Sequence, residues 1–570
     1  MSKFDFSDGL DGNGGQGRSP AYYFLWHLVA LGVIEAEFGP VTMGDDGLSA
    51  SPSPTITGAV WDRIGAAFPE AFEPAVVALI DVGVSKLHPN LRTRIDAERS
   101  IDLASHRYGA RTQAIDPNDP HEREQQAPFF TGLDISGLGA IGLDAGDTAF
   151  LTAFVAELAA SKGVVRQLVD VDETFGAHGT AAAGLVVGEP AAIVDSDSDS
   201  APASVDPDLL ATSDSDTVSI NPNRGLLPYF GVDPFSKLIS IRTSFDADPD
   251  QFIAAFLHAW NCRADVILLP RGLPDPLRSH VLPKPDLADN ADLRDNQEKA
   301  DLLARLAVAP TSGELDPYAS AVPGHPDRAW AILEKLIVAI SRKIPVICAA
   351  GNDGESQIIY PAKLAASDNG VVAVGAVTPN GYRSGFSNYG EGLTLVAPAD
   401  DSEIYNRHQL RRDTTQPAAS THYFDPGQGQ TVPYSSYALI TTDLPGIYGY
   451  EAGSPPGSMR VPPFTAPGTG GGYYTTFGGT SGASALVAGV AALAARANKA
   501  RNGADARLDG LHSKAILIQS CRHATAVRPG TAPLAPDPMN GDDEPAKGLA
   551  YYFGAGLLDA AKVVDAVLGA

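Results

Sequence analysis

The chain has 570 residues, with 41 Lys and Arg against 68 Asp and Glu, which gives a formal net charge of −27. Hydrophobic residues make up 44% and charged residues 19%, a composition typical of a large packed core and not of a disordered chain. Because a nucleic-acid partner requires a basic surface that neutralises phosphates, the acidic balance argues against nucleic-acid binding.

The N-terminal region predicts one buried helix. Residues 1–20 are rich in Gly and Asp and lack the basic stretch followed by an apolar core that a signal peptide needs. Residues 21–34 are apolar but shorter than the roughly 20 residues of a membrane span. With Ser19 as cap and Pro20 in the first turn, they predict a buried or docking helix. No other stretch predicts a membrane span, so we expect no membrane partner.

The cysteines give no disulfide framework. The chain has three of them, at positions 262, 348 and 521, and no two form a CxxC pair. This pattern is compatible with a reducing compartment. Together with the missing signal peptide, it leads us to expect a cytoplasmic protein.

From residue 75 onward, apolar runs alternate with helical patterns. We predict buried strands in the runs that begin at residue 75 and at 237–243, 264–269, 345–352 and 370–377. We predict helices at 248–262 and 328–343. This alternation predicts an α/β fold with a mostly parallel central sheet and helices on both faces. Ligands of such sheets bind beyond the carboxyl ends of the strands, where Asp81 and Asn352 lie.

Long polar stretches interrupt this pattern and are predicted to be surface insertions near 190–220, 271–327 and 400–435. The Ser/Asp-rich residues 194–218 lack the ligand spacing of an EF-hand, which favours a solvated linker over a calcium site. A further insertion near 92–170 contains the apolar, helix-like stretch 148–161. We expect it to fold near the rim of the active site, where it restricts access or binds a regulatory protein partner.

Three residues combine the side chains that acyl transfer needs. Ser481 lies in a run of small residues at the start of an apolar helix, His178 precedes a Gly-Thr step and a small-residue helix, and Asp81 ends a buried strand. Each has an ordinary structural interpretation: a helix cap, a core or surface histidine, and a strand end. Together they supply a hydroxyl nucleophile, an imidazole base and an orienting carboxylate.

Four segments resemble the signature regions of the subtilisin-like serine proteases (subtilases, peptidase family S8) in the order Asp, His, Asn, Ser. They are ALIDVGV (78–84), GAHGTAAAG (176–184), CAAGNDG (348–354) and GGTSGASALVAG (478–489). The resemblance covers roughly residues 74–566 and implies the subtilisin-like fold. Subtilisin is the standard example of this chain order.

Carried over to this chain, the resemblance implies a serine endopeptidase. Ser481 is then the nucleophile, His178 the general base, Asp81 the carboxylate that orients it and Asn352 the side-chain donor of the oxyanion hole. The chemistry requires no cofactor. Structural calcium is common in the family, but no ligands for it can be assigned here. The alternative is a catalytically silent or partner-gated relative that uses the same site to bind peptides.

The resemblance also implies a peptide-binding edge. The strand 264–272 is similar to the family strand whose end pairs with the backbone of a protein or peptide substrate. This places Pro270, Arg271 and Gly272 on one side of the substrate, with Gly351 and Asp353 near the oxyanion position. Arg271 favours acidic substrate side chains and Asp353 basic ones, so the specificity stays open.

The resemblance divides the chain into an N-terminal extension, residues 1–70, and a catalytic domain, residues 71–566. The extension has no clear match to the family's pro-segment. A divergent pro-segment, an adaptor and an extra helix docked on the catalytic body remain as interpretations.

Overall fold

The computed structural model describes the core of the chain and parts of its surface. The described residues are 25–38, 42–43, 49–50, 54–69, 71–85, 88–103, 110–113, 133–160, 164–167, 176–190, 229–243, 248–273, 325–378, 381–399, 423–425, 430–432, 439–444, 449–450, 474–525, 532–536 and 547–569. The predicted linker 194–218 and most of the predicted insertions 271–327 and 400–435 lie outside them.

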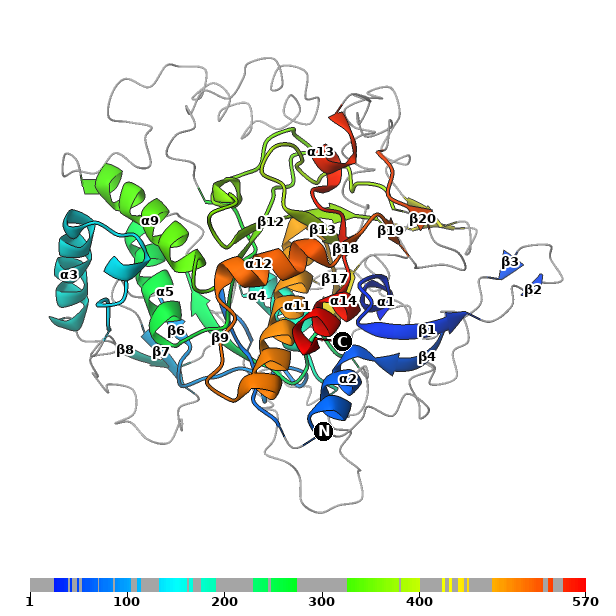
Figure 1. Cartoon of the computed structure of the whole chain (residues 1–570), viewed down its shortest axis with the longest axis horizontal. Helices are drawn as coiled ribbons and strands as arrows, with labels where there is room; N and C mark the ends of the chain where they lie inside the picture. Colours follow the sequence, from blue (N-terminus) through cyan, green and yellow to red (C-terminus); the bar gives the residue numbers. More distant parts are fainter. Residues whose placement is uncertain are drawn as a thin grey trace, which may run out of the picture.

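A mostly parallel sheet forms the centre of the molecule (Figure 1). Within the described residues it has 11 strands in the order β18-β21-β13-β12-β11-β10-β5-β9-β6-β7-β8. The antiparallel pairs are β18 with β21 and β6 with β7. The strands are β5 (Val76–Asp81), β6 (Ile101–Asp102), β7 (Ala110–Gln113), β8 (Val164–Gln167), β9 (Lys237–Arg242), β10 (Val266–Leu269), β11 (Val346–Ala349), β12 (Val371–Val377), β13 (Leu395–Pro398), β18 (Cys521–Arg522) and β21 (Leu557–Leu558).

Helices cover both faces of the sheet, because its central strands bury side chains on both sides. In β5, Val77 and Leu79 belong to one hydrophobic cluster, whereas Ala78 and Ile80 belong to the other. The first cluster contains α4 (Ala177–Val187), α11 (Gly479–Asn502) and α14 (Ala560–Leu568), and the second contains α5 (Pro249–Asn261) and α9 (His325–Ser341). The predicted α/β fold is therefore confirmed.

The remaining elements are short or peripheral. The helices are α1 (Trp26–Ala30), α2 (Val60–Ala67), α3 (Ala145–Ala160), α12 (Gly510–Gln519) and α13 (Leu549–Phe553), with 3₁₀ turns η3 (Gly139–Ile141) and η6 (Ala362–Leu364). Two-stranded antiparallel pairs are formed by β1 (Ile34–Phe38) with β4 (Pro54–Ala59), β2 (Thr42–Met43) with β3 (Ser49–Ala50), β14 (Tyr423–Asp425) with β15 (Gln430–Val432), β16 (Leu439–Thr442) with β17 (Tyr474–Phe477), and β19 (Ala524–Thr525) with β20 (Ala532–Pro533).

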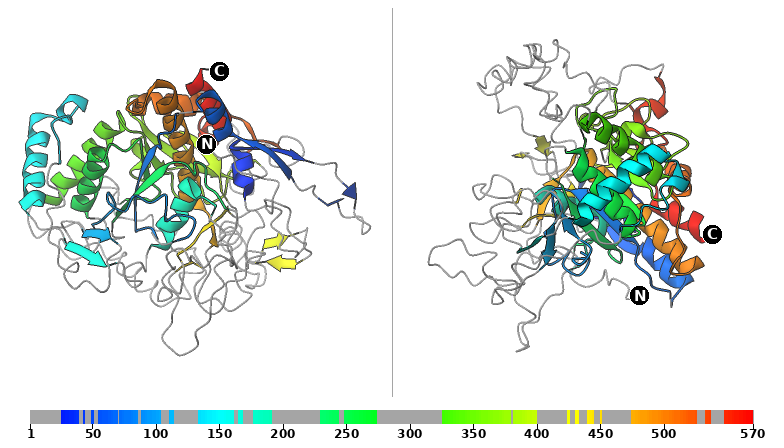
Figure 2. Two further views of the ribbon diagram at one scale, coloured as in Figure 1. Left: turned by 90° about the horizontal axis from the view of Figure 1, so that it is seen from below. Right: turned by 90° about the vertical axis from the view of Figure 1, so that its left-hand side faces the viewer.

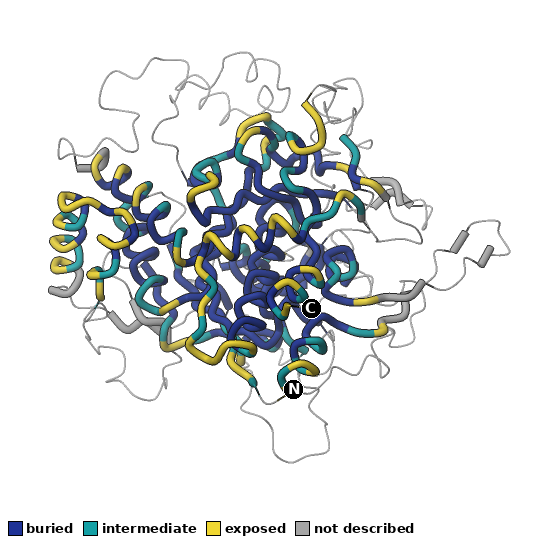
Figure 3. Tube along the Cα trace, in the orientation of Figure 1, coloured by how far each residue is buried: buried dark blue, intermediate teal, exposed yellow. Residues whose placement is uncertain are grey.

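Helix α11 is the central helix of the body. Its first 21 residues, from Gly479 to Lys499, are all buried, and it packs on β10, β11, β12 and β13 (Figure 3). Among the described helices, α11 alone is long and apolar enough to span a membrane, and its apolar window lies entirely inside the protein. Small residues along this helix allow the sheet and the helices beside it to approach closely.

The strands and long helices predicted from the apolar runs are confirmed, whereas the first predicted helix is shorter than expected. Helix α1 ends at Ala30, and residue 34 already begins β1. Gly32 makes this turn possible, since its φ of +70° is a left-handed conformation that favours glycine. A Cβ at this position would also lie only 3.0 Å from Asp559 Oδ1.

The described N-terminal residues share the core of the sheet and its helices. Trp61 of α2 is 1% exposed and packs edge-on against Phe230, with the ring centroids 5.5 Å apart. The Ala560 N–H donates to Leu31 O at 2.7 Å, and Arg63 forms an ion pair with Asp565 at 3.1 Å. Trp61 also packs against Phe235, with the ring centroids 6.2 Å apart. Because Phe235 lies two residues before the start of β9, α2 lies near the amino ends of the strands, the edge opposite Asp81.

The insertion helix α3 lies on the outer layer of helices, packed on α9, and much of the rest of the predicted insertion 92–170 lies outside the described residues. Lys335 of α9 pairs with Asp147 at 2.8 Å, and the Arg328 guanidinium lies over the Phe150 ring at 5.4 Å. Figures 1 and 2 show α3 beside α9 at one end of the molecule and the β1/β4 hairpin at the other. The partly apolar surface of α3 thus packs on α9, which explains why this stretch looks like a core helix in the sequence.

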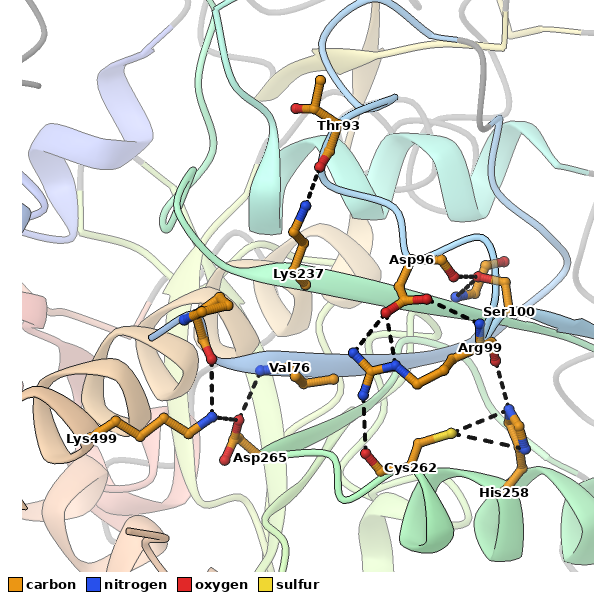
Figure 4. Close-up of polar contacts among 12 residues, drawn as sticks. Val76, Thr93, Asp96, Arg99, Ser100, Lys237, His258, Cys262, Asp265 and Lys499 are labelled. Atoms are coloured by element: carbon orange, nitrogen blue, oxygen red, sulfur yellow. Dashed lines mark hydrogen bonds and ion pairs between the residues drawn. The ribbon is translucent and has the colours of Figure 1, made fainter. Parts of the chain in front are cut away.

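Buried polar contacts tie the amino ends of the strands together (Figure 4). Asp265, before β10, accepts hydrogen bonds from Lys499 Nζ at 2.6 Å and from Val76 N at 2.8 Å. In a neighbouring cluster, His258 Nε2 lies 2.7 Å from Arg99 O and 3.4 Å from the Cys262 Sγ. Burial lowers the pKa of His258 to about 4 and raises that of Cys262 to about 11. Both groups are therefore neutral near pH 7.

His27 is expected to make the fold sensitive to acid. It is completely buried, and neither ring nitrogen has a hydrogen-bond partner among the described residues. Burial lowers its pKa from 6.5 to about 3. Between these values the unfolded chain binds more protons than the folded one, so the free energy of unfolding falls as the pH falls. The loss due to His27 between pH 7 and pH 5 is about 2 kcal/mol.

His27→Leu should remove this loss. Denaturant unfolding of both proteins at pH 7 and pH 5 measures it, with the exposed His512 of α12 replaced by leucine as control. An equal loss of stability in wild type and His27→Leu would contradict the prediction.

Candidate active site

The four predicted catalytic residues come from different elements. Asp81 is the last residue of β5, His178 the second residue of α4 and Ser481 the third residue of α11. Asn352 lies in the loop after β11. The carboxyl ends of parallel strands meet at one edge of the sheet, and the start of α11 joins that edge through the Ser481 contact described below.

Asp81 and His178 form a close pair. His178 Nδ1 lies 2.7 Å from Asp81 Oδ2, and Asp81 Oδ1 accepts the N–H of Val82 at 2.8 Å. The carboxylate is 1% exposed and the imidazole side chain 19%. A proton on Nδ1 satisfies this contact, which leaves Nε2 as the ring's acceptor. That is the tautomer required for a general base.

Residues around His178 explain how α4 comes so close to β5. A Cβ on Gly179 would lie 2.0 Å from Gly83 O, so only glycine allows this approach. The next residue, Thr180, accepts the Ser85 N–H on its hydroxyl at 2.8 Å. The Gly-Thr step after His178 therefore seats the helix against the loop that follows Asp81.

Ser481 does not cap its helix. Gly478 precedes α11 without a side-chain cap, and Ser481 Oγ donates to Pro270 O at 2.7 Å. The structure describes both Ser481 and His178, and no hydrogen bond joins them. His178 contacts Phe477, the last residue of β17, just before α11. The two rings meet edge-on, with their centroids 5.2 Å apart. Proton transfer to His178 thus requires the serine hydroxyl to leave the Pro270 carbonyl.

Asn352 is held by Thr480, a residue that the sequence analysis missed. Asn352 Oδ1 accepts the Thr480 N–H at 2.8 Å and the Thr480 hydroxyl at 2.9 Å. The same hydroxyl accepts the Gly351 N–H at 3.1 Å. Because both Thr480 donors engage Oδ1, the amide is oriented with Nδ2 at its other end. Its position directly before Ser481 could have indicated a role for Thr480 in the site.

A second missed residue, Asn388, shapes the loop that carries Asn352. Asn388 Oδ1 accepts the N–H groups of Asp353 at 2.8 Å and Glu355 at 3.2 Å, and its own N–H donates to Gly351 O at 3.0 Å. The residue is 1% exposed. The sequence did contain a clue to Asn388. It lies in the Phe-Ser-Asn step of the segment 360–400, which resembles the family, but the resemblance implied no role for it.

The predicted substrate residues lie at the ends of two neighbouring strands. Pro270, Arg271 and Gly272 follow β10, and Gly351 and Asp353 flank Asn352 after β11. The Arg271 guanidinium lies over the Phe252 ring at 5.8 Å. Its partial burial lowers its pKa, and the Asp81 charge opposes this shift. Arg271 thus contacts α5 of the body, whereas Asp353 is exposed.

Neither a cluster of metal ligands nor a reactive cysteine is found among the described residues. No three His, Cys, Asp or Glu side chains in this part of the chain gather as metal ligands. The three cysteines are unpaired, and burial raises the pKa of Cys521 to about 12 and that of Cys348 further. They are therefore protonated and poorly nucleophilic near neutral pH.

The chain was compared with protein families and with known proteins. The model of the subtilase family matches residues 73–435 and 449–556. Subtilisin BL of Lederbergia lenta is 41% identical over 75 residues, which are 13% of this chain and 26% of that protein. An extracellular serine proteinase of Thermus sp. (strain Rt41A) is 44% identical over 61 residues, which are 10% of this chain and 14% of that protein. The alignment thus spans about a quarter or less of these curated relatives.

The comparison with solved structures gives matches at low identity. The epidermin leader peptide processing serine protease of Staphylococcus aureus is 15% identical with a TM-score of 0.41, and the match covers 88% of this chain and 78% of that one. The prenylagaramide maturation protease is 14% identical with a TM-score of 0.38, covering 89% and 98%. The chain belongs to the subtilase family, as the extent of the family match shows. Members of this family are typically serine endopeptidases acting on proteins or peptides.

Proposed function

We propose that this chain is a serine endopeptidase that hydrolyses peptide bonds through an acyl-enzyme on Ser481. The observation that carries the proposal is the 2.7 Å contact between His178 Nδ1 and Asp81 Oδ2, two residues 97 positions apart. Such a contact orients an imidazole as a general base and stabilises it once it is protonated. Ser481 and Asn352 add the nucleophile and a donor at the same edge of the sheet.

The proposed reaction uses each side chain in turn. Ser481 Oγ attacks the scissile carbonyl carbon while His178 Nε2 takes the hydroxyl proton. The amide of Asn352 donates to the oxyanion, held in place by Thr480. The protonated imidazole then gives its proton to the leaving amine, which breaks the peptide bond. Water, activated by His178 in the same way, hydrolyses the ester and restores Ser481.

Substrate binding would prepare the nucleophile. In the free protein the Pro270 carbonyl accepts the Ser481 hydroxyl at 2.7 Å. We propose that an extended substrate pairs with the backbone at the end of β10 and competes for this carbonyl with a backbone N–H. Rotation of the released hydroxyl about the Cα–Cβ bond then directs it towards His178.

The same hydrogen bond favours a second candidate, a silent or partner-gated peptide-binding scaffold. If the serine hydroxyl stayed on Pro270 O, His178 would receive no proton and no acyl-enzyme would form. The two functions differ in the reactivity of Ser481.

A fluorophosphonate probe tests this reactivity. We expect stoichiometric labelling of the wild-type chain and none of Ser481→Ala, because only an activated serine attacks the phosphorus. Ser513→Ala, which removes another buried serine hydroxyl in α12, is the matched control and should label normally. Intact-protein mass spectrometry measures the adduct. Absence of labelling with and without peptide would support the scaffold and reject the enzyme.

A further inference from the structure

Two glycines border the place where a substrate side chain would enter. Gly272 lies two residues after Pro270, whose carbonyl holds Ser481 Oγ, and Gly351 directly precedes Asn352. Their strands, β10 and β11, are parallel neighbours. A scissile carbonyl must place its carbon at Ser481 and its oxygen at Asn352. The side chain on the acyl side is attached to the Cα next to that carbon, and it therefore projects towards these strand ends.

Ile359 occupies the space between the two glycines. A Cβ on Gly272 would lie 2.8 Å from Ile359 Cδ1, and a Cβ on Gly351 would lie 2.7 Å from Ile359 Cγ2. One branched side chain thus contacts both strand ends at once. It is partly exposed, as expected for the apolar floor of a binding site.

The backbone around Ile359 is anchored on both sides. The Ile359 N–H donates to Ala350 O at 3.0 Å, beside β11. The next residue, Tyr360, accepts the Leu273 N–H on its carbonyl at 2.8 Å, beside β10. Because these bonds link the segment to both strand ends, a larger substrate side chain cannot push the Ile359 backbone aside without breaking backbone hydrogen bonds.

We propose that Ile359 is a specificity-determining residue that restricts the acyl-side residue of the substrate to a small side chain, such as glycine, alanine or serine. This inference rests on the proposed endopeptidase function. A large apolar side chain would need the volume that Ile359 already fills, and close-packed sites tolerate such overlap poorly. A difference of one methylene in an apolar site changes kcat/KM by about 10–200-fold.

Tetrapeptide p-nitroanilides that differ only in their last residue test the restriction, because the dye fixes which residue lies on the acyl side. We expect wild-type kcat/KM for alanine to exceed that for phenylalanine by about 100-fold or more, and that for leucine by at least about 10-fold. A wild-type chain that cleaves the phenylalanine or leucine substrate as well as the alanine one would overturn the proposal.

Replacement of Ile359 should reverse the preference. In Ile359→Ala, kcat/KM for the phenylalanine and leucine substrates should rise about 10–100-fold, with a change of less than about threefold for alanine. Ile358→Ala removes the same atoms from the neighbouring residue, which is buried in the core at 3% exposure, and should leave the ratios unchanged. Unchanged ratios in Ile359→Ala, or an equal change in Ile358→Ala, would contradict the assignment.

Failure of this inference is distinguishable from failure of the proposed function. If the proposed function is wrong, the fluorophosphonate does not label Ser481. If only the specificity assignment is wrong, the chain is labelled and active, but its substrate preference does not depend on residue 359. Even if Ile359→Ala does not fold, the wild-type ratios decide whether small side chains are preferred.

Discussion

Replacement of His178 by alanine is expected to lower kcat for peptide hydrolysis by about 10⁴–10⁶-fold. The range is that of triad substitutions in serine proteases, including subtilisin, a member of the same family. Without the imidazole, Ser481 has no base to take its proton and the leaving amine has no acid to protonate it. Steady-state kinetics with the alanine p-nitroanilide measure the loss, and KM should change little because the ring is not needed to bind the peptide backbone.

Two variants separate the chemistry from folding. Asp81→Asn keeps the shape of the His178 partner but favours the wrong tautomer, and a loss of about 10⁴-fold in kcat is expected. His512→Ala removes an exposed imidazole in α12 and should retain full activity. If His178→Ala kept more than about a hundredth of wild-type kcat, the imidazole would not be the general base.

Replacement of Asn352 by leucine should lower kcat by about 10²–10³-fold with little change in KM. In the proposed reaction the amide donates to charge that develops only in the transition state, so its loss should raise the barrier without weakening ground-state binding. Leucine has a similar shape and no donor. Asn352→Asp should be at least as damaging, because a carboxylate would face the developing oxyanion. Single-turnover acylation rates measure the effect directly.

The Thr480 hydroxyl should contribute to the same step through Asn352. Thr480→Val keeps the shape and the N–H bond to Asn352 Oδ1 but removes the hydroxyl that bonds Asn352 and Gly351. We expect a loss of about 10-fold in kcat, and Thr480→Ser should restore most of it.

The prediction for Asn352 has its own test. An Asn352→Leu variant with more than a third of wild-type kcat would show that the amide does not stabilise the transition state.

Most of the central fold could be predicted from residue patterns. The continuous apolar runs of β5, β9, β10, β11 and β12 indicated strands buried on both faces, and the structure confirms them. The helical patterns of α5 and α9 are confirmed as well. Where the prediction depended on local turn geometry it was wrong in extent: α1 ends at Ala30, because the chain turns at Gly32, whose φ of +70° favours glycine, before β1 begins.

The candidate site could be predicted in its residue types but not in its contacts. The sequence identified four candidate residues, Asp81, His178, Asn352 and Ser481. They lie in glycine-rich segments that resemble the signature regions of the family. The placement of α3 on α9, and of Trp61 against Phe230, depends on packing between residues far apart in the chain. No local pattern encodes which of several surfaces an apolar helix covers.

By itself, the sequence determined the family, the α/β class and the identity of the candidate catalytic side chains, because strand periodicity and short motifs are local properties. Only the tertiary structure decided that Ser481 rests on the Pro270 carbonyl, that Thr480 orients Asn352 and that Ile359 fills the space between Gly272 and Gly351. Each of these depends on distances of about 3 Å between residues that lie up to 211 positions apart in the chain. Such distances result from how the whole core packs.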